Sequence, residues 1–482
     1  MAGLVSLLAV AGCIGMAKDE ETTEAQSAGE QLDHDAIQDE IGEPIEMFHD
    51  HTDPAVHNQS HNLEIVAYSD LGVDVGEDGN GFADFQFHEE DGEELAVVAV
   101  DGDDEGGFNI VDVSDPQTME TIGTYRIAGS GIQEAVWSPS GDYVLMNVQT
   151  IPPADEGAGD CQVCIHVVDV SDRSNPELVS RFPVDLLGTH NIELETVDGE
   201  TWVFYTGQPF GSDPAGNYVG IARLVETPAG AHLAKVTEYR HTDTYQQQNV
   251  SSFPHDTFIE EHPVTGDLTM YASWWDGGAI TVDVSDPAAP VEQDKVRQWA
   301  PSEELSIHQF RPEPNARGQQ VFGYSAPEIG QLDNGSGVVR SYDLTDPANF
   351  EQVGSWQLPG NVTIPGQYLM SPHVVSPHPD QPLAAVGHYH AGVWVLDTSD
   401  PANPEHVAFN ERTGGPGELF DGDYWWKKPN FDPEGYIPNI FRATWHEDQI
   451  WVTERGSGLY VYDYTGPTPG DGEADPAPAA AR

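Results

Sequence analysis

Four histidines of this 482-residue chain recur at near-regular intervals and could together hold a metal ion. They are His190, His255, His308 and His373, which are 65, 53 and 65 residues apart. Neutral imidazole is the commonest protein ligand for transition metals such as Cu, Zn and Fe. Three or four imidazoles around one axis would hold such an ion and leave a coordination position open for a substrate. The alternative is that these side chains hydrogen-bond water and backbone groups in a wet channel.

Further polar and aromatic side chains stand in loops that we expect to reach the same face of the fold. His388 and His390 would add imidazoles to the predicted metal site. Trp274, Trp275 and Glu454 would contact a bound ligand. Small-molecule sites typically combine aromatic walls with a few convergent polar groups. These loops therefore predict a ligand site beside the metal.

A long insertion, residues 410–440, is expected at the same face and carries an unusual basic spot. It holds Trp425, Trp426, Lys427 and Lys428, in a chain with only 18 Lys and Arg residues. Cations beside aromatic rings can receive an anionic or sugar-like ligand. The alternative is an apolar lid packed over the channel, with the lysine head groups reaching water.

The three cysteines indicate export more than redox catalysis. Cys161 and Cys164 have the spacing of a redox or zinc pair, but there is no second pair and no strand–helix alternation around them. In an exported protein we expect them to form a short loop disulfide, with metal binding beside His166 as the alternative. Cys13 ends the sequence Val-Ala-Gly-Cys, which resembles a lipobox, so we expect it to be lipidated.

The elements that must position these residues belong to a unit that recurs about every 57 residues. Most units contain a run of β-branched residues that ends in Asp and is followed by Ser or Thr and a second Asp. The first aspartates of the copies are Asp112, Asp169, Asp283, Asp343, Asp397 and Asp463, and the copy midway between Asp169 and Asp283 has Leu224 instead. A fixed period of this length indicates a repeat architecture. Asp and Ser side chains bond neighbouring amides, so we expect a turn after each run.

Each unit predicts four short strands, because β-branched and aromatic runs alternate with Gly, Pro and Asp turns. In the sixth unit we expect strands at 372–376, 383–389, 392–397 and 404–409. Seven such units make an all-β, seven-bladed β-propeller. The last unit lacks an outer strand, which residues 63–68 would supply. This N-terminal strand would close the ring and remove an exposed edge.

The propeller explains how distant histidines would converge. The innermost strands of all blades run in the same direction along a central channel, so residues at equal positions form a ring near one mouth. The four histidines hold this position in units three to six, and Glu134 holds it in unit two.

On the repeated strand the chain resembles the LVIVD-repeat family of surface β-propellers, over about residues 63–466. The resemblance implies a propeller displayed on the cell surface, of the salt-adapted type found among haloarchaeal lipoproteins. It implies little about chemistry, because the family is defined by its repeat. The third unit departs from the family pattern at Leu224.

The charge of the chain excludes several classes of partner. Asp and Glu number 82 against 18 Lys and Arg, which gives a formal net charge of −64. Such a chain cannot build the basic face that nucleic acids or anionic membrane surfaces require. Self-repulsion opposes folding at low ionic strength and is screened near 1 M salt. We therefore interpret the composition as an adaptation to molar salt.

The chain divides into one folded region and flanking acidic segments. We expect a signal and lipobox segment at 1–17, an acidic, His-containing tether at 18–60, the propeller at 61–466, and a disordered tail at 467–482. The tether and the tail are acidic and aperiodic, which is typical of disorder. We expect a monomeric protein that is anchored outside the cell by lipid or secreted, and that meets the membrane only through the anchor.

Two functions are consistent with these observations. The first is a binding or scaffold module for a protein partner or small ligand at one face of the propeller. The second is a metal-dependent oxidoreductase that uses the histidines at the channel mouth. No nucleophile elbow, phosphate loop or dinucleotide fingerprint points to another enzyme class.

Overall fold

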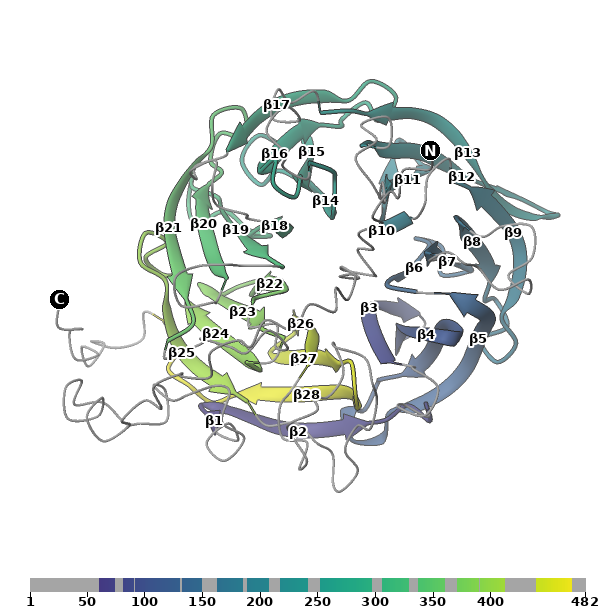
Figure 1. Ribbon diagram of the computed structural model, residues 1–482, viewed down its shortest axis with the longest axis horizontal. Coiled ribbons are helices and arrows are strands. Elements are labelled where there is room, and N and C mark those ends of the chain that lie inside the picture. Colours follow the sequence, from purple (N-terminus) through teal and green to yellow (C-terminus); the bar gives the residue numbers. More distant parts are fainter. Residues whose placement is uncertain are drawn as a thin grey trace, which may run out of the picture.

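The structure is a computed structural model that shows seven antiparallel sheets arranged radially around a central axis (Figure 1). The predicted all-β, seven-bladed propeller is confirmed. The described residues are 60–73, 81–90, 92–130, 132–149, 163–184, 189–207, 217–241, 252–296, 306–328, 337–359, 371–389, 391–411 and 439–469.

The blades follow one another in chain order. Blade one contains β3 (Gly81–Glu90), β4 (Glu93–Asp112) and β5 (Glu120–Ser130), with the 3-10 turn η2 (Pro116–Thr118) before β5. Blade two contains β6 (Ala135–Trp137), β7 (Tyr143–Gln149), β8 (Val163–Asp169) and β9 (Glu177–Pro183). Blade three contains β10 (Thr189–Val197), β11 (Glu200–Gly207), β12 (Val219–Thr227) and β13 (Gly230–Tyr239). Blade four contains β14 (Thr257–Glu261), β15 (Leu268–Ser273), β16 (Ala279–Asp283) and β17 (Val291–Val296).

The remaining blades take strands from both ends of the described chain. Blade five contains β18 (Ile307–Pro312), β19 (Phe322–Pro327), β20 (Val338–Asp343) and β21 (Glu351–Gln357). Blade six contains β22 (Val374–Pro377), β23 (Leu383–Gly387), β24 (Val393–Asp397), β25 (Glu405–Asn410) and the edge strand β1 (Ser60–His61). Blade seven contains β26 (Ile440–His446), β27 (Gln449–Glu454), β28 (Gly458–Tyr464) and β2 (Leu63–Ser69).

The long strand β4 fills two positions of blade one. The Val113 amide donates a hydrogen bond to the Glu94 carbonyl oxygen at 2.9 Å, although the two residues are 19 positions apart. A continuous extended strand would separate them by about 60 Å. The chain therefore folds back within β4, and blade one has a second and a third strand like the other blades.

The repeated Asp-Ser/Thr-Asp phrase ends its copies in blades one, two, four, five and six in a turn, as predicted. In blade four, Asp283 Oδ1 accepts a hydrogen bond from the Ser285 amide at 2.9 Å, and Asp286 Oδ1 accepts one from the Ala288 amide at 3.1 Å. Equivalent bonds close the turns of four other blades, through Asp112 and Asp115, Asp169 and Asp172, Asp343 and Asp346, and Asp397 and Asp400. Blade three lacks the aspartate because β12 and β13 form a continuous hairpin that pairs through to Thr227 and Gly230.

The N-terminal strand closes the ring, as predicted. Strand β2 pairs with β28 from Leu63 opposite Tyr464 to Ser69 opposite Leu459. Just before it, β1 pairs with β25 on the neighbouring blade, so the first strands bridge blades six and seven at the rim (Figure 1). The turn between them is fixed by Asn410, whose Nδ2 donates to the Leu63 carbonyl at 3.0 Å.

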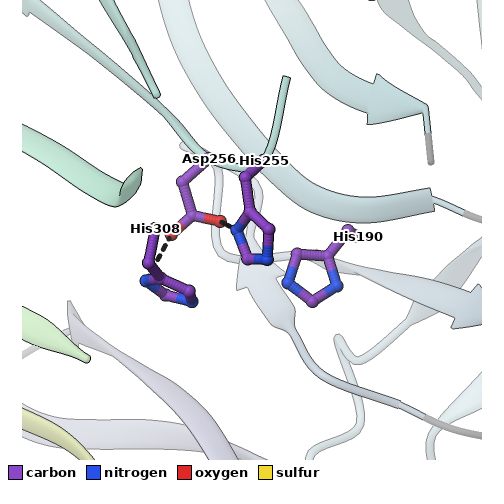
Figure 2. Close-up of side chains that lie close together, drawn as sticks. All are labelled: His190, His255, Asp256 and His308. Carbon is purple, nitrogen blue, oxygen red and sulfur yellow. Dashed lines mark hydrogen bonds and ion pairs between the residues drawn. The ribbon is translucent and has the colours of Figure 1, made fainter. Parts of the chain in front are cut away.

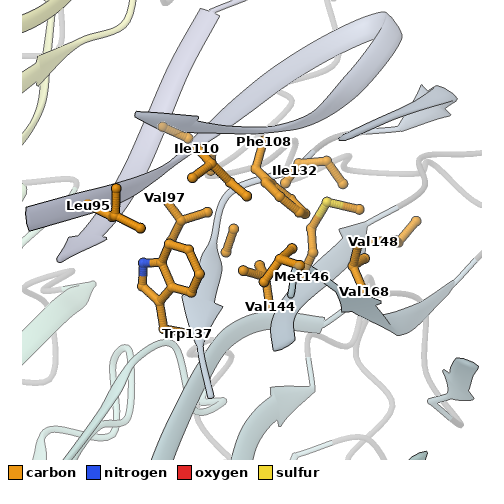
Figure 3. Close-up of a cluster of buried hydrophobic side chains, with 14 of the residues drawn as sticks. Leu95, Val97, Phe108, Ile110, Ile132, Trp137, Val144, Met146, Val148 and Val168 are labelled. Atoms are coloured by element: carbon orange, nitrogen blue, oxygen red, sulfur yellow. The ribbon is translucent and has the colours of Figure 1, made fainter. Parts of the chain in front are cut away.

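Among the described residues, the hydrophobic core forms seven clusters that each join two neighbouring blades, and the cluster of blades one and two also includes Tyr389 and Phe441. Figure 3 shows the cluster in which Phe108 and Ile110 of blade one face Trp137, Val144 and Met146 of blade two. These side chains are at most 4% exposed. Since no blade can bury its faces alone, the ring holds its inner strands, and the side chains they carry, in a fixed relation.

Several predicted segments lie outside the described residues. They are the signal and lipobox segment at 1–17, the tether except for Ser60, the insertion from 412 to 438, and the tail from residue 470 onward. Among the residues that the structure does describe, no helix has the length and hydropathy that a membrane crossing requires.

Candidate functional site

The four inner-strand histidines lie together at one end of the central channel. His190 stands in β10 and His308 in β18, while His255 and His373 directly precede β14 and β22. Ring centroids are 4.2 Å apart for His190 and His255, 4.4 Å for His255 and His308, and 3.7 Å for His308 and His373. The equal positions in the repeat thus converge in space, and Figure 2 shows three of these rings facing one another beside Asp256.

Three of the four histidines are neutral. Each of the four residues is at most 4% exposed. Burial lowers the pKa of His190, His308 and His373 well below the ordinary value of an imidazole, and positively charged neighbours lower it further. A neutral imidazole keeps one ring nitrogen with a free lone pair, which is the form that binds a metal or accepts a hydrogen bond.

His255 differs from the other three because it lies between two carboxylates. Its Nδ1 is 3.1 Å from Asp256 Oδ1, and its Nε2 is 3.4 Å from Glu328 Oε2. Burial opposes the charged form of His255, but the hydrogen bonds and charges of these two acids outweigh it and raise the pKa to about 9. The Trp275 ring stacks on the imidazole with centroids 4.9 Å apart and planes at 20°, an arrangement that also favours a cation.

We predict that His255 alone among the four is protonated at pH 7.5 in chelator-treated protein, with a midpoint near pH 9. Because its pKa is raised above the unfolded value of about 6.5, its charge stabilises the fold fully below that pH. This contribution is lost as the pH rises through about 9. Long-range ¹H–¹⁵N NMR of the ring nitrogens measures the protonation directly. Glu328→Gln should lower the midpoint, and a neutral His255 in the wild type at pH 7.5 would contradict the assignment.

Two acids at the centre of the site were not anticipated from the sequence. Asp256 contacts two histidines, since its Oδ2 also lies 3.6 Å from His308 Nδ1. The signal for Asp256 was its position directly after a site histidine. Glu328 lies in blade five, in the loop after β19 that joins the second and third strands. The equivalent loops carry Trp275 in blade four and Tyr389 in blade six. The Tyr389 hydroxyl donates to Glu328 Oε1 at 3.0 Å, which orients the carboxylate towards His255.

The histidines open into a pocket that continues down the channel and is rich in acids. It encloses about 410 Å³, including space open to solvent, and its charged side chains other than histidine are Asp84, Glu134, Glu193, Asp256 and Arg442. The Arg442 guanidinium already donates to Asp84 Oδ1. Burial raises the pKa of Glu193 to about 8 and that of Glu134 well above the ordinary value. An entering cation therefore meets several acceptor oxygens, whereas an anion meets one arginine that is already paired.

Three other predicted site residues do not join the cluster. The His388 ring packs edge-on against Trp356, with centroids 6.3 Å apart. Trp274 lies in the core between blades three and four, at 1% exposure. Glu454 is buried in a turn, where it accepts hydrogen bonds from the Asn439 and Gly456 amides. Their predicted ligand roles thus have no support in the geometry, while Trp275 covers His255 as expected of a site residue.

The remaining predicted residues lie outside the described part of the chain. They are His390, Cys13, Cys161, Trp425, Trp426, Lys427 and Lys428. Cys164 is described, and it is buried and disulfide-bonded. Its pairing with Cys161 stays a prediction.

Comparison with known proteins supports the repeat. A profile of the LVIVD repeat matches residues 98–126, 163–184 and 266–297, so blades one, two and four contain LVIVD repeats. No curated protein matches the chain.

Two solved structures are similar to the chain at low identity. One is Raptor of Chaetomium thermophilum, with 16% identity, a TM-score of 0.45, 81% of this chain covered and 29% of that one. The chain thus spans less than a third of the Raptor chain's length. The other is the β-propeller domain of Cps50 (Swd1) from Myceliophteria thermophila, with 12% identity, a TM-score of 0.48, and coverage of 83% and 99%.

Proposed function

We propose that this propeller is a binding module that takes a small ligand at the histidine mouth of its central channel. One observation carries the proposal: four histidines from four blades meet Asp256 and Glu328 in a buried cluster, of which His190, His308, His373 and Asp256 line a pocket. Convergent polar groups in a concavity are the usual mark of a ligand site. Burying so many polar groups costs free energy, because each group loses its contacts with water. Such a cluster therefore indicates a functional role.

We also propose that the module works outside the cell in molar salt, as a monomer. The net charge of −64 supports the salt adaptation and argues against nucleic-acid partners. The lipobox-like sequence ending at Cys13 supports lipid anchoring, with secretion as the alternative. The disulfide of Cys164 fits an oxidising compartment.

The alternative function, a metal-dependent oxidoreductase, would use the same histidines. The propeller fold and the LVIVD repeats fit a binding or scaffold role, and neither favours a reaction. Binding is therefore the proposal that the geometry supports best.

A thermal-shift panel in molar KCl tests this proposal. We expect at least one member of a set of Cu²⁺, Zn²⁺, Fe²⁺, phosphate and simple sugars to raise the Tm, because a ligand that binds only the folded state stabilises it. The shift should disappear in His308→Ala and persist in His232→Ala, which removes an exposed imidazole of blade three. Equal shifts in both variants, or no shift with any member, would refute a small-ligand site at the mouth.

A further inference from the structure

Part of the histidine cluster has the composition and the compactness of a metal site. His190, His255, Asp256 and His308 each offer one ligand atom, and these atoms all lie within 4.8 Å of one another. In a tetrahedral site with ligands at about 2.1 Å from the ion, the ligand atoms are about 3.4 Å apart. The four groups therefore need to move only by fractions of an ångström to meet one ion.

From this geometry we infer that a divalent transition-metal ion is the ligand of the mouth, held by His190, His255, His308 and the Asp256 carboxylate. The inference rests on the proposed function, since it names the occupant of the same site. Three imidazoles with one carboxylate suit Zn²⁺, Cu²⁺ or Fe²⁺. Binding would release the proton that His255 carries in the metal-free protein, because an imidazole ligates in its neutral form. Ca²⁺ and Mg²⁺ require mostly oxygen ligands and do not fit this set.

His373 provides a second, independent observation that points to a ligand at the mouth. Its Nδ1 bonds the Phe441 carbonyl oxygen, which can only accept, so the ring proton sits on Nδ1. Its Nε2 is therefore a lone-pair acceptor, and this buried atom has no hydrogen-bond partner among the residues that the structure describes. A backbone carbonyl that fixes the tautomer of a histidine is the usual support of a metal-ligating imidazole. The side chain lines the same pocket, which places an additional nitrogen donor beside His308.

The groups around the pocket favour a cation over an anion. Among the described residues, four acids line it, and its one guanidinium, that of Arg442, is bonded to Asp84. Asp84 lies on β3 and Glu193 on β10, while Glu134 and Asp256 stand just before β6 and β14. Burial raises the pKa of Glu134 and Glu193, so these two acids contribute acceptor oxygens rather than full negative charge.

Titration of chelator-treated full-length protein with Co²⁺ in 2 M KCl tests the assignment. We expect one equivalent to bind with visible d–d absorption, because nitrogen ligands of the mouth replace water around the ion. Metal content of untreated protein, measured by mass spectrometry, should also approach one equivalent. In His308→Ala and His190→Ala we expect affinity to fall by more than about 100-fold, since changing even an outer-shell partner costs about 10- to 100-fold.

Controls separate the mouth from other cation sites of this acidic chain. His232→Ala should bind Co²⁺ like the wild type, and His373→Gln should keep the stoichiometry while changing the absorption spectrum. Each variant is checked by circular dichroism, and His308→Gln replaces His308→Ala if the latter does not fold. Full stoichiometry and an unchanged spectrum in both the His190 and His308 variants would place the metal elsewhere and overturn the inference.

The failure of this inference is distinguishable from failure of the proposed function. Absence of any Co²⁺ spectrum and of bound transition metal would overturn the metal assignment. If phosphate or a sugar then still shifts the Tm in the wild type and not in His308→Ala, the mouth remains a binding site for a different ligand. If no ligand shifts the Tm, both proposals fail together.

Discussion

Dilution from 2 M to 10 mM KCl should unfold the propeller, with loss of most of its far-UV circular dichroism. The chain carries a net charge of −64. The second aspartate of the repeated turn is exposed in five blades, at Asp115, Asp172, Asp286, Asp346 and Asp400. The screening length grows from about 3 Å at 1 M to about 30 Å at 0.01 M salt, so carboxylates on neighbouring blades begin to repel one another. This repulsion is stronger in the compact ring than in the unfolded chain, so it destabilises the folded state.

Two controls make the salt experiment specific. Dilution into low salt with sucrose should not preserve the fold, because sucrose strengthens apolar burial but does not screen charge. Lowering the pH towards 4 in dilute salt should delay the loss, since protonation removes exposed negative charge. A spectrum that is unchanged in 10 mM KCl at pH 7.5 would refute the salt-adaptation proposal.

The second large effect is expected at the strand that closes the ring. Leu63 is 0% exposed and belongs to the core cluster of blades six and seven. We predict that Leu63→Asp costs about 4 kcal/mol or more of unfolding free energy, because it buries an unpaired charge and removes an apolar side chain. Denaturant unfolding in molar KCl measures the loss.

Ile65 provides the matched control on the same strand. Its side chain is 37% exposed, so Ile65→Asp adds the same charge without burying it. We expect a change of less than about 1 kcal/mol. Equal destabilisation by the two substitutions would mean that the added negative charge causes the loss, and not the removal of the buried Leu63 side chain from the closing strand.

The fold was predictable because the repeat encodes it locally. Each Asp-Ser/Thr-Asp phrase fixes its own turn through two side-chain bonds to amides, as at Asp283 and Asp286. Seven similar units then leave little choice of architecture, and the unpaired outer edge of blade seven identifies Leu63–Ser69 as the closing strand. The convergence of the four histidines follows from the same regularity, since equal positions in the repeat become neighbours in space.

The directions of the loop side chains were harder to predict, because a shift of one residue along the chain turns a side chain from the core to the site. Trp274 and Trp275 are adjacent in the sequence, yet the first enters the core and the second stacks on His255. The backbone of Trp275 has a φ of 36°, a conformation that no periodic pattern announces. The chain has 82 acidic residues, so nothing in the sequence distinguished Asp256 and Glu328 from the others. Only their short distances to His255 identify them as site residues.

The strand order at the rim also determines how the molecule would carry a mechanical load. Traction applied through the residues that precede Ser60 first reaches the two-residue pairing of β1 with β25. Once those two residue pairs have separated, the load reaches β2, which pairs with β28 from Leu63 to Ser69. Strand β1 would therefore separate from β25 before β2 separates from β28. A moderate pull on the N-terminal residues would open and re-form the β1 pairing, while the ring of blades and the side chains at the axis stay in place.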